Sequence, residues 1–388
     1  MPVAVRFACG VCRSFVSGWA TVDGESVGAC PPEAFRVNSD FWSGRRVLIT
    51  GHTGFKGAWL ALWLEHAGAA VIGLALEPED PNAAFGAFGE WKSLRSHIVD
   101  LRDAEAVARV IAATDPQTIL HLGAQALVRR GYADPVGTYA VNVLGTANVL
   151  AGAATAPSLE AIVVVTSDKV YANPGNGRAF TEDDRLGGSD PYSNSKSCAE
   201  LVAAAWRQSF FLSGSPALAT ARAGNVIGGG DRGDGRLVPD IRRSLTGGAP
   251  LRLRYPQATR PWQFVLEPLW GYLLLAERLA AAPHAAPHAV NFGPDAAEAI
   301  PVVQVVGRVF GLWGDGEWTD EDKEQPHEAD SLCLDASLAH TALGWRPVLD
   351  LDTALAWTVE WWRAEAAGAD CRKVALGQIE AYRARAAS

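Results

Sequence analysis

Residues 47–57 read Val47-Leu48-Ile49-Thr50-Gly51-His52-Thr53-Gly54-Phe55-Lys56-Gly57, and this stretch decides the fold. A short apolar run leads into three glycines spaced three apart, and an apolar, helix-like run follows them. In a dinucleotide-binding fold, the first glycine permits the turn from strand to helix and the second lets the backbone approach a pyrophosphate. The third lets the helix pack closely on the strand, so that the helix N-terminus faces the phosphate charge. The stretch therefore predicts a nucleotide site. The strand and helix around it disfavour the alternative, a tight turn without a ligand.

The sequence after this turn alternates between strand-like and helix-like segments. Apolar, strand-like runs occur at residues 71–76, 97–100, 118–122 and 161–165. Helix-like segments occur at residues 58–66, 103–113 and 134–150. Strands that alternate with helices and are apolar on both faces are typical of a doubly wound parallel sheet. We therefore predict an α/β chain with a Rossmann-type domain over residues 37–225.

Beyond residue 225 the alternation loosens. A glycine-rich segment at residues 228–235 is expected to form a mobile loop. The last clear helix is expected at residues 351–366. Its three tryptophans favour packing in a core or an interface over stacking on a ligand, and they are Trp357, Trp361 and Trp362. We predict that residues 226–388 form mainly a smaller C-terminal substrate-binding lobe, with some segments returning to the Rossmann domain.

Composition excludes several classes of protein. The chain has 388 residues, 48% of them hydrophobic and 20% charged, which suffices for a large globular core. The net charge of -9 and the lack of any Lys/Arg run argue against nucleic-acid binding. No stretch is long and apolar enough to predict a membrane span. We therefore expect a cytoplasmic protein with neither a nucleic-acid nor a membrane partner.

The cysteines predict neither a disulfide framework nor a metal site. Their scattered placement fits a reducing cytoplasm, and they are Cys9, Cys12, Cys30, Cys198, Cys333 and Cys371. Cys9 and Cys12 have the spacing of half a zinc site or of a redox pair. No second such pair and no pair of histidines accompanies them, so we predict that no metal is bound.

Residues 1–36 differ from the rest of the chain. They show no clear period and mix Gly, Ser, Pro and Cys. Only Arg6 precedes a short apolar stretch, which makes a poor signal peptide. We predict an N-terminal extension that is disordered or a mis-assigned start, with Val37 as an alternative initiation site. Peptides from residues 1–36 in mass spectra of the native protein would contradict this hypothesis.

Polar residues follow the predicted strand at 161–165. They read Thr166-Ser167-Asp168-Lys169. Ligands of an open α/β sheet lie beyond the carboxyl ends of its strands. These side chains are therefore expected to face the ligand crevice, with a simple turn as the alternative.

Tyr192 and Lys196 follow on the next predicted helix. Because they are four residues apart, they share one helical face. A lysine ammonium favours the phenolate form of a neighbouring tyrosine, so we expect it to lower the pKa of Tyr192. Tyr192 is then a candidate base at neutral pH. This spacing is common by chance, but its place after a fifth strand that ends in Ser167 makes it more specific.

These features resemble the extended short-chain dehydrogenase/reductase superfamily. Within it, residues from about 40 to 362 are similar to the bacterial CDP-glucose 4,6-dehydratase family. The segments that carry the resemblance are residues 50–57, Thr166-Ser167-Asp168-Lys169, Asp190-Pro191-Tyr192-Ser193-Asn194-Ser195-Lys196, Arg260-Pro261-Trp262-Gln263-Phe264-Val265-Leu266-Glu267-Pro268, Pro326-His327-Glu328-Ala329 and Leu343-Gly344-Trp345-Arg346-Pro347.

The resemblance implies an internal redox reaction on CDP-glucose with NAD as cofactor, and hence a place in deoxysugar and lipopolysaccharide O-antigen biosynthesis. Tyr192, supported by Lys196, would accept the hydroxyl proton at sugar carbon 4 while hydride passes to NAD. Water would leave across carbons 5 and 6, and the hydride would return to carbon 6. Ser167 would hydrogen-bond the oxygen at carbon 4. Asp168 would protonate the leaving hydroxyl, which requires a protonated carboxyl, as burial would favour.

Lys169 stands where related dTDP-sugar dehydratases carry a glutamate. A lysine can remove the proton at carbon 5 only in its neutral form. Alternatively, it stabilises the developing enolate electrostatically while the proton leaves by another route. We expect a catalytic role for Lys169 and leave these two roles open.

The resemblance also implies a set of cofactor-binding residues. They are Gly51, Thr53, Gly54, Phe55, Lys56, Gly57, Asp100, Leu101, Gly123, Ala124, Gln125, Tyr192 and Lys196. Leu101 replaces an isoleucine of the family pattern and Gly123 an alanine. Asn142 matches an asparagine that stabilises the site, although a buried asparagine bonded to backbone would have the same geometry. The acid that usually binds the adenosine ribose is displaced or missing, since Ala75 stands there and Glu77 follows, so NAD versus NADP stays open.

For the substrate, Asn225 and Arg260 are the candidates to hold the diphosphate, because a guanidinium fits phosphate oxygens in a bidentate manner. Phe264 stands where the family often has histidine, which suggests a different contact at the nucleotide edge. The superfamily usually forms dimers through two helices, so we expect a homodimer or homotetramer. The apolar run at residues 199–211 is a candidate contact.

Three other functions are compatible with parts of this pattern. An epimerase would keep Tyr192 and Lys196 but needs no acid such as Asp168. A dTDP- or GDP-sugar dehydratase needs the acid, yet normally has glutamate at position 169. A protein that only senses NAD would have no reason to keep Ser167, Asp168, Tyr192 and Lys196 together.

Overall fold

The structure is a computed structural model that describes residues 38–212, 216–294, 299–321 and 332–387. All of these residues belong to one compact unit. The extension predicted at residues 1–36 lies outside the described residues, and so does the segment Pro326-His327-Glu328-Ala329.

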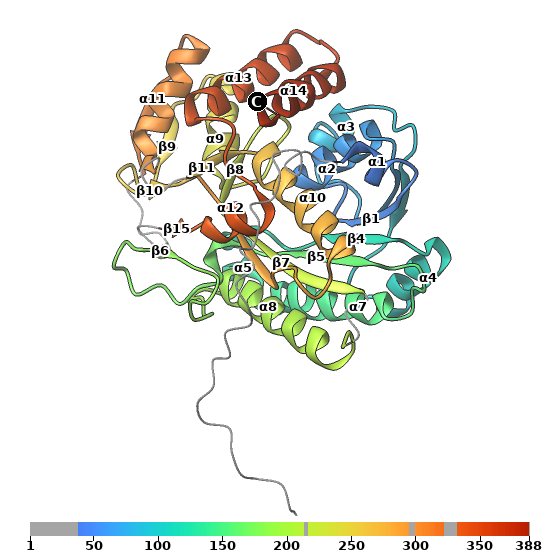
Figure 1. The fold of residues 1–388 in the computed structure, drawn as a ribbon. Coiled ribbons are helices and arrows are strands. Elements are labelled where there is room, and N and C mark those ends of the chain that lie inside the picture. Colours follow the sequence, from blue (N-terminus) through green and yellow to red (C-terminus); the bar gives the residue numbers. More distant parts are fainter. Residues whose placement is uncertain (1–37, 213–215, 295–298, 322–331, 388) are drawn as a thin grey trace, which may run out of the picture. The chain divides into compact units, whose positions relative to one another are not determined.

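A seven-stranded parallel sheet is the centre of the fold (Figure 1). Its strand order is β12-β7-β5-β4-β1-β2-β3. The strands are β1 Arg46–Thr50, β2 Ala70–Ala75, β3 Arg95–Ile98, β4 Thr118–His121, β5 Ala161–Val165, β7 Ala217–Ala223 and β12 Ala289–Phe292. The order reverses between β1 and β4, which is where ligands of such sheets bind. The predicted Rossmann-type doubly wound α/β fold is therefore confirmed, although β3 begins and ends two residues earlier than expected.

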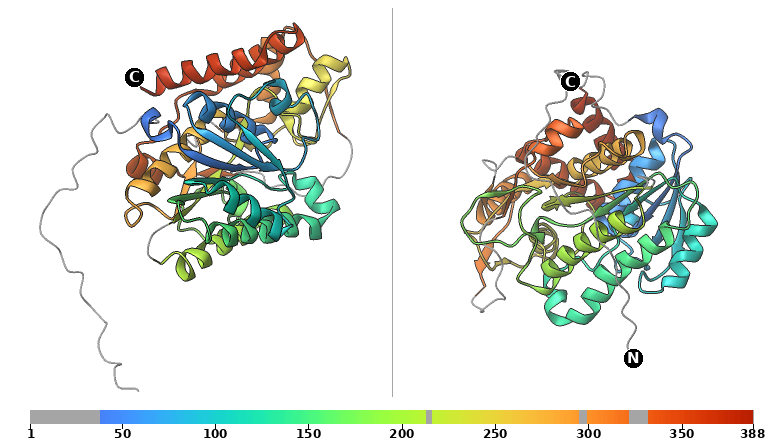
Figure 2. Two further views of the ribbon diagram at one scale, coloured as in Figure 1. Left: turned by 90° about the vertical axis from the view of Figure 1, so that its right-hand side faces the viewer. Right: turned by 60° about the horizontal axis from the view of Figure 1, so that its bottom comes forward.

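Helices cover both faces of this sheet (Figures 1 and 2). One face packs α4 Ala104–Thr114, α7 Gly145–Ala153 and α8 Pro191–Ser209 into a core of their own. The other face packs α2 Phe55–His66 and α10 Leu266–Ala281 into the larger core. The helix predicted at residues 134–150 is present, but it consists of α6 Pro135–Tyr139, a π-helical turn Ala140–Leu144 and α7.

The remaining chain forms short strand pairs and helices. The pairs are β8 Asn225–Ile227 with β11 Trp262–Phe264, β9 Leu251–Leu253 with β14 Trp318–Asp320, β10 Thr259–Arg260 with β13 Ile300–Pro301, and β6 Ala179–Phe180 with β15 Cys333–Leu334. The helices are α1 Ser39–Trp42, α3 Ala84–Ala87, α5 Val128–Ala133, α9 Leu237–Gly247, α11 Val302–Trp313, α12 Ser337–Leu343, α13 Leu351–Ala366 and α14 Cys371–Ala386. Strand β12 follows residue 225 in the sequence but belongs to the central sheet, as expected of a segment that returns to the Rossmann domain. The division into two domains at residue 225 stays a prediction.

Two expectations about the C-terminal half need correction. α13 has the predicted bounds and buries Trp361 and Trp362, but it is not the last helix, because α14 follows. The sequence of α14 hides its period, since alanines and charged residues dominate and only a narrow stripe is buried. The loop expected at residues 228–235 begins with a buried part. A Cβ on Gly229 would lie 2.1 Å from the Trp361 ring, so this glycine packs against α13.

Within the described ranges, no helix has the length and apolar character that crossing a bilayer would require.

Candidate active site

The glycine turn joins β1 to α2 as predicted. Gly51 has a φ of 74°, and a Cβ there would lie 2.8 Å from Gly123 at the end of β4. A Cβ on Gly57 would lie 2.0 Å from the carbonyl oxygen of Gly51, so only glycine lets α2 pack on the turn. Gly54 is the N-cap of α2, and no side chain caps the first turn. The N–H groups of an uncapped first turn fit the phosphate oxygens of a dinucleotide.

Two departures from the family pattern compensate each other. A Cβ on Gly123 would lie 2.7 Å from Cδ1 of Leu101, which is buried. The leucine therefore fills the space that an alanine methyl group would need at position 123. The neighbouring Asp100 is bound by Arg102, whose guanidinium hydrogen-bonds the carboxylate at 2.6 Å and lowers its pKa. The predicted adenine-side acid thus already has a cationic partner.

The end of β2 does not decide between NAD and NADP. Ala75 is its last residue and is buried, whereas Glu77 is exposed beyond it. Thr53 is fixed to this strand end, because its hydroxyl donates to the carbonyl oxygen of Leu76 at 2.9 Å. Phe55, next to the turn, is half-buried and lies close to Gly228.

Lys56 enters the site from the first turn of α2. Its Nζ donates to the hydroxyl of Tyr272 on α10 at 3.2 Å. The pKa of Lys56 is lowered to about 7, chiefly by desolvation and then by the charges of Lys196 and Arg236, and the charge of Asp168 opposes this shift. Lys56 therefore lies within electrostatic reach of the residues after β5.

The π-helical turn places Asn142 between β4 and α8. Asn142 is 1% exposed; its Oδ1 accepts from the Gln125 N–H at 2.8 Å, and its Nδ2 donates to the Gln125 carbonyl at 3.0 Å. Nδ2 also donates to Ser195 Oγ at 2.9 Å, and Ser195 Oγ in turn donates to the carbonyl of Tyr192. Asn142 thus links the Ala124–Gln125 turn to the helix of Tyr192. π-Helical turns often occur at functional sites.

His121 ends β4 as a buried, neutral imidazole. Its Nδ1 lies 2.7 Å from Thr50 Oγ1 and its Nε2 lies 3.0 Å from Thr146 Oγ1. Burial, and next the charge of Lys196, lower the pKa of His121 to about 3. This residue therefore orders the ends of β1 and β4 without carrying charge.

Ser167, Asp168 and Tyr192 come together at the end of β5, as expected. Ser167 Oγ donates to Asp168 Oδ1 at 2.9 Å and is close enough to the phenol of Tyr192 to lower its pKa. Asp168 is 3% exposed, and its Oδ2 has no hydrogen-bond partner among the described residues. One oxygen of this carboxyl is thus held by serine, and the other is buried and available to a ligand.

The expected lowering of the pKa of Tyr192 is wrong. The pKa of Tyr192 is raised, chiefly because its phenol is buried, and Ser167 and Arg236 oppose this shift. The Nζ of Lys196 donates to the Val165 carbonyl at 3.1 Å. Burial lowers the pKa of Lys196 itself to about 8. Helical spacing indicated a shared face correctly, but it could not indicate how strongly that face is desolvated.

Lys169 lies in the 3-10 turn Asp168–Val170 and is half-buried. Its backbone N–H donates to Ser167 Oγ at 3.2 Å. Its placement next to Asp168 is as expected, and the choice between its two roles stays a prediction.

A pair of short strands faces these residues. A Cβ on Gly224 would lie 3.0 Å from Asp168 Oδ2, so the chain before β8 runs beside the carboxyl. Asn225 of β8 is in register with Trp262 of β11. Asn225 Nδ2 and Trp262 Nε1 are buried and have no hydrogen-bond partner among the described residues. Trp262 was given no role from sequence, although the Arg260–Pro268 segment that contains it was singled out.

Arg260 begins this segment, and Phe264 lies in its middle, at the end of β11. Arg260 is 7% exposed, and its Nη1 donates to the Thr259 carbonyl at 2.9 Å. Phe264 is wrongly expected at a nucleotide edge. It is fully buried. Its ring packs edge-on against Trp59 and Trp357, with ring centroids 5.9 Å and 5.4 Å apart, so it belongs to the hydrophobic core.

Arg236 is a further candidate that the sequence reading missed. It is paired with Asp231 at 3.2 Å, and it is close enough to Tyr192 to lower the pKa of the phenol. The only signal in the sequence is its place directly after the glycine-rich residues 228–235, since glycines allow a chain to approach a ligand closely.

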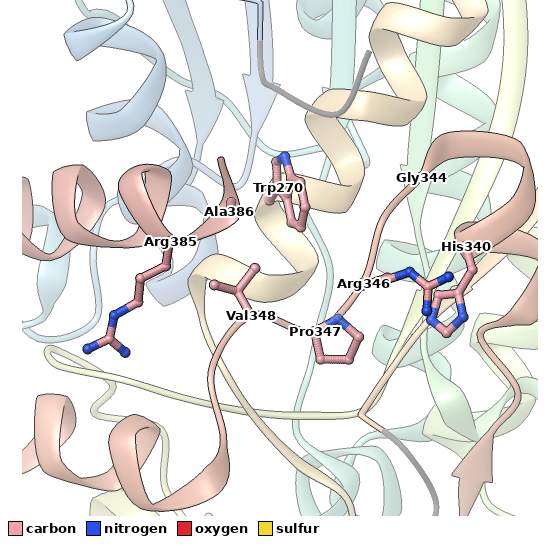
Figure 3. A pocket seen from close by; sticks show the side chains of 8 residues that line it. All are labelled: Trp270, His340, Gly344, Arg346, Pro347, Val348, Arg385 and Ala386. Atoms are coloured by element: carbon pink, nitrogen blue, oxygen red, sulfur yellow. The ribbon is translucent and has the colours of Figure 1, made fainter. Parts of the chain in front are cut away.

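Figure 3 shows a pocket away from these residues. Its lining comes from α10, α12, α14 and the loop after α12, and it includes none of the predicted site residues. Arg385 turns away from Arg346 and His340 in this view, so the basic groups do not converge on one point. In the segment Leu343–Pro347, Trp345 is buried, and its indole N–H donates to the Glu267 carbonyl at 3.0 Å, so this residue has a structural contact with α10. Across the described part of the chain, no group of three His, Cys, Asp or Glu residues could hold a metal ion.

Comparisons with known proteins agree with this geometry. Residues 47–293 match the model of the NAD dependent epimerase/dehydratase family. A CDP-glucose 4,6-dehydratase from Salmonella typhimurium is 42% identical over 355 residues, which cover 89% of this chain and 98% of that protein. A dTDP-glucose 4,6-dehydratase from Haemophilus influenzae is 24% identical and covers 81% of this chain and 97% of its own length.

Solved structures show the same fold. A dTDP-glucose 4,6-dehydratase from Streptomyces venezuelae, solved with NAD and TYD bound, has a TM-score of 0.73 at 24% identity. The match covers 84% of this chain and 98% of that one. An epimerase from Methanothermobacter thermautotrophicus has a TM-score of 0.77 at 22% identity, covering 87% and 98%. The family match spans more than half of the chain and the Salmonella relative covers most of it, so the chain belongs to the NAD dependent epimerase/dehydratase family.

Proposed function

We propose that the chain catalyses the NAD-dependent dehydration of CDP-glucose to CDP-4-keto-6-deoxyglucose, as a hydro-lyase. The observation that carries this proposal is the placement of Asp168 beside Ser167 and Tyr192 at the end of β5. A buried acid next to the base is needed to expel a hydroxyl, and an epimerase has no use for one. The 42% identity to the Salmonella enzyme supports both the reaction and CDP-glucose as its substrate.

In the oxidation step, Tyr192 would accept the proton from the hydroxyl at sugar carbon 4, and Ser167 would hold that oxygen. Because burial raises the pKa of Tyr192, its phenolate needs nearby positive charge. Arg236 lowers the pKa of the phenol, and Lys196, one turn further along α8, is a second cation on the same helical face. When bound, NAD supplies the hydride acceptor at carbon 4 and the hydride donor at carbon 6.

In the elimination step, Asp168 would give its proton to the hydroxyl leaving carbon 6. Its Oδ2 is buried without a hydrogen-bond partner among the described residues, which suits a group that contacts the substrate. Lys169, the next residue, would either remove the proton at carbon 5 in its neutral form or stabilise the enolate as an ammonium. Only the first role requires Lys169 itself to take up the proton.

We assign the diphosphate of the substrate to Asn225 and Arg260. Arg260 supplies a nearly buried guanidinium, and Asn225 Nδ2 is a buried donor without a partner among the described residues. Both features fit phosphate oxygens.

The alternative substrates are dTDP-, GDP- and UDP-linked sugars, acted on by a dehydratase or an epimerase. Incubation of the protein with NAD and each of the four nucleotide-glucoses decides among them. We expect the alkali-dependent absorbance of a 4-keto product with CDP-glucose alone. Turnover of dTDP-glucose without CDP-glucose would contradict the proposed substrate, and interconversion of UDP-glucose and UDP-galactose would support the epimerase.

We further propose that the protein is a homodimer or homotetramer in contact through α8. Leu201 and Phe210 on and after this helix are 58% and 64% exposed, which is unusual for such large apolar residues. Light scattering of the wild type and of Leu201→Arg tests this. A monomeric wild type would contradict it.

We also propose a cytoplasmic location and a supply of keto sugar for deoxysugars of the lipopolysaccharide O-antigen. The cysteines among the described residues are free, as in a reducing compartment. Loss of 6-deoxysugars from the surface polysaccharide of a deletion strain is the expected result, and an unchanged sugar composition would contradict it.

A further inference from the structure

A buried ion pair lies directly behind the candidate catalytic residues. Glu200 is on α8, one turn after Lys196, and Arg222 is on β7. Their side chains are 3% and 5% exposed. Arg222 Nε donates to Glu200 Oε1 at 3.0 Å and its Nη2 donates to Oε2 at 2.8 Å, which is a bidentate arrangement.

Two threonines complete the hydrogen bonding of this carboxylate. Thr166 Oγ1 donates to Glu200 Oε1 at 2.5 Å, and Thr220 Oγ1 donates to Oε2 at 2.6 Å. Each oxygen therefore accepts two hydrogen bonds, and all four come from groups that can donate. Such a set fits an ionised carboxylate, which can only accept.

The pair is also tied to the chain after β5. Arg222 Nη1 donates to the hydroxyl of Tyr171 at 2.8 Å, and Tyr171 donates to Asn291 Oδ1 of β12 at 2.7 Å. Tyr171 directly follows the turn that carries Asp168 and Lys169. The network thus fixes the chain both before and after these residues.

Lys196 and Glu200 hydrogen-bond two consecutive residues, the last residue of β5 and the one after it. Lys196 Nζ bonds the carbonyl of Val165, and Glu200 accepts from the side chain of Thr166. The next two residues are Ser167 and Asp168. One face of α8 therefore fixes the chain at Val165 and Thr166, directly before Ser167 and the candidate acid Asp168.

The charged and titratable groups that face Lys196 come from three elements. They are Glu200 on α8, Lys56 on α2 and His121 on β4. Burial lowers the pKa of Lys196 to about 8, and Glu200 opposes this shift. His121, with its pKa lowered to about 3, is neutral near pH 7, and Lys56 repels Lys196. Glu200 is thus the group that favours the ammonium.

We infer that Glu200, held as a carboxylate by Arg222, is a positioning residue that keeps Lys196 charged and fixes the end of β5 ahead of Ser167 and Asp168. This inference rests on the proposed function for the roles of Lys196, Ser167 and Asp168. Glu200 is buried in its ion pair with Arg222, and we assign it no contact with substrate or cofactor.

The test is the pH dependence of Glu200→Gln. Loss of the carboxylate charge disfavours the ammonium, so the pKa of Lys196 falls and Lys196 loses its proton at lower pH. Activity that requires the ammonium is lost as pH rises through that pKa. We expect the alkaline limb of kcat/KM for CDP-glucose to move down by about one pH unit. The alkaline limb of NADH affinity, measured by fluorescence, should move in the same direction.

Two further variants keep the test decisive. Glu200→Gln leaves the Arg222 charge buried and unpaired, which can prevent folding. The double variant Glu200→Gln/Arg222→Met removes both charges and should show the same lowered limb. Glu65→Gln is the matched control, because Glu65 pairs with Arg372 at 5% and 16% exposure between α2 and α14. It should lower Tm and leave both limbs in place.

The outcomes separate this inference from the proposed function. A wild type that does not turn over CDP-glucose defeats the proposed function, and the NADH limb then decides the inference alone. Alkaline limbs that stay at the wild-type pH in both Glu200 variants overturn the inference, as does an equal shift in Glu65→Gln. A shift confined to the Glu200 variants supports it.

Discussion

In the strand-end region, formed by the last residues of β4, the π-helical turn at residues 140–144 and α8, a buried polar side chain on each element has hydrogen-bond partners within the protein. His121, Asn142 and Glu200 each have a partner for every buried polar atom. In the β8–β11 region, residues 224–264, Asn225 and Trp262 each bury a donor that has no partner among the described residues. Buried donors without partners cost stability, so they suggest groups that a ligand completes.

The difference indicates a division of labour. The strand-end region is held by hydrogen bonds within the protein, which suits groups that move protons and must keep a fixed geometry. The β8–β11 region keeps donors unused, which suits recognition of a polar substrate. Asp168 lies between them, since one of its oxygens is bonded to Ser167 and the other is not.

Asp168→Asn should have the largest effect, because it removes the acid where the two regions meet. We expect formation of the keto product to fall about a thousandfold. Oxidation at carbon 4 does not need this acid, so bound NADH should accumulate and be visible by absorbance. Loss of the NADH signal together with product, in a folded variant, would instead place Asp168 in the oxidation step.

Lys169→Met should come next, with exchange of the carbon 5 proton in deuterated water reduced about a hundredfold. Both roles considered for Lys169 require its amino group, so both predict this loss. Lys373→Met is the control, because Lys373 is 83% exposed on α14 and far along the chain from the site. Exchange at the wild-type rate in Lys169→Met would defeat both roles.

Two asparagines then compare the regions directly. Asn142→Ala removes bonds to Gln125 and Ser195, so it should lower the free energy of unfolding by about 2 kcal/mol, measured in urea, and lower kcat. Asn225→Ala removes a donor that has no partner in the described residues. It should cost little stability and raise KM for CDP-glucose about tenfold. The comparison fails if Asn225→Ala unfolds as easily as Asn142→Ala with KM unchanged.

Local requirements made much of the fold predictable. The glycine turn could be predicted because positive φ at Gly51 and close packing at Gly57 depend on backbone geometry within a few residues. The strand at 161–165 could be predicted because a β-branched run is rare outside buried strands. Ser167 and Asp168 directly follow β5, and Tyr192 lies in the first turn of α8, so the start of this helix lies at the edge of the sheet where β5 ends.

Properties that depend on packing could not be predicted. The raised pKa of Tyr192 follows from burial by the whole site, which spacing along α8 does not contain. The role of Trp262 depends on its register with Asn225, set by two strands far apart in the sequence. Phe264 lies two residues further along β11 in the same hydrophobic core, but only Trp262 has a buried donor without a partner among the described residues.

Two tryptophans give the smallest and most specific test of the comparison. The indole N–H of Trp345 donates to the Glu267 carbonyl at 3.0 Å, whereas that of Trp262 has no partner among the described residues. Replacement by Phe removes the N–H in each case and reduces the ring by a similar amount. Trp345→Phe should therefore lose about 1 kcal/mol more unfolding free energy than Trp262→Phe, because only Trp345 loses a hydrogen bond. Trp262→Phe should instead raise KM for CDP-glucose a few-fold and leave kcat unchanged, as expected of a donor that binds the ground state and the transition state equally. Equal stability losses with an unchanged KM would mean that Trp262 is a core residue, and that the donors left over in the β8–β11 region do not mark a binding surface.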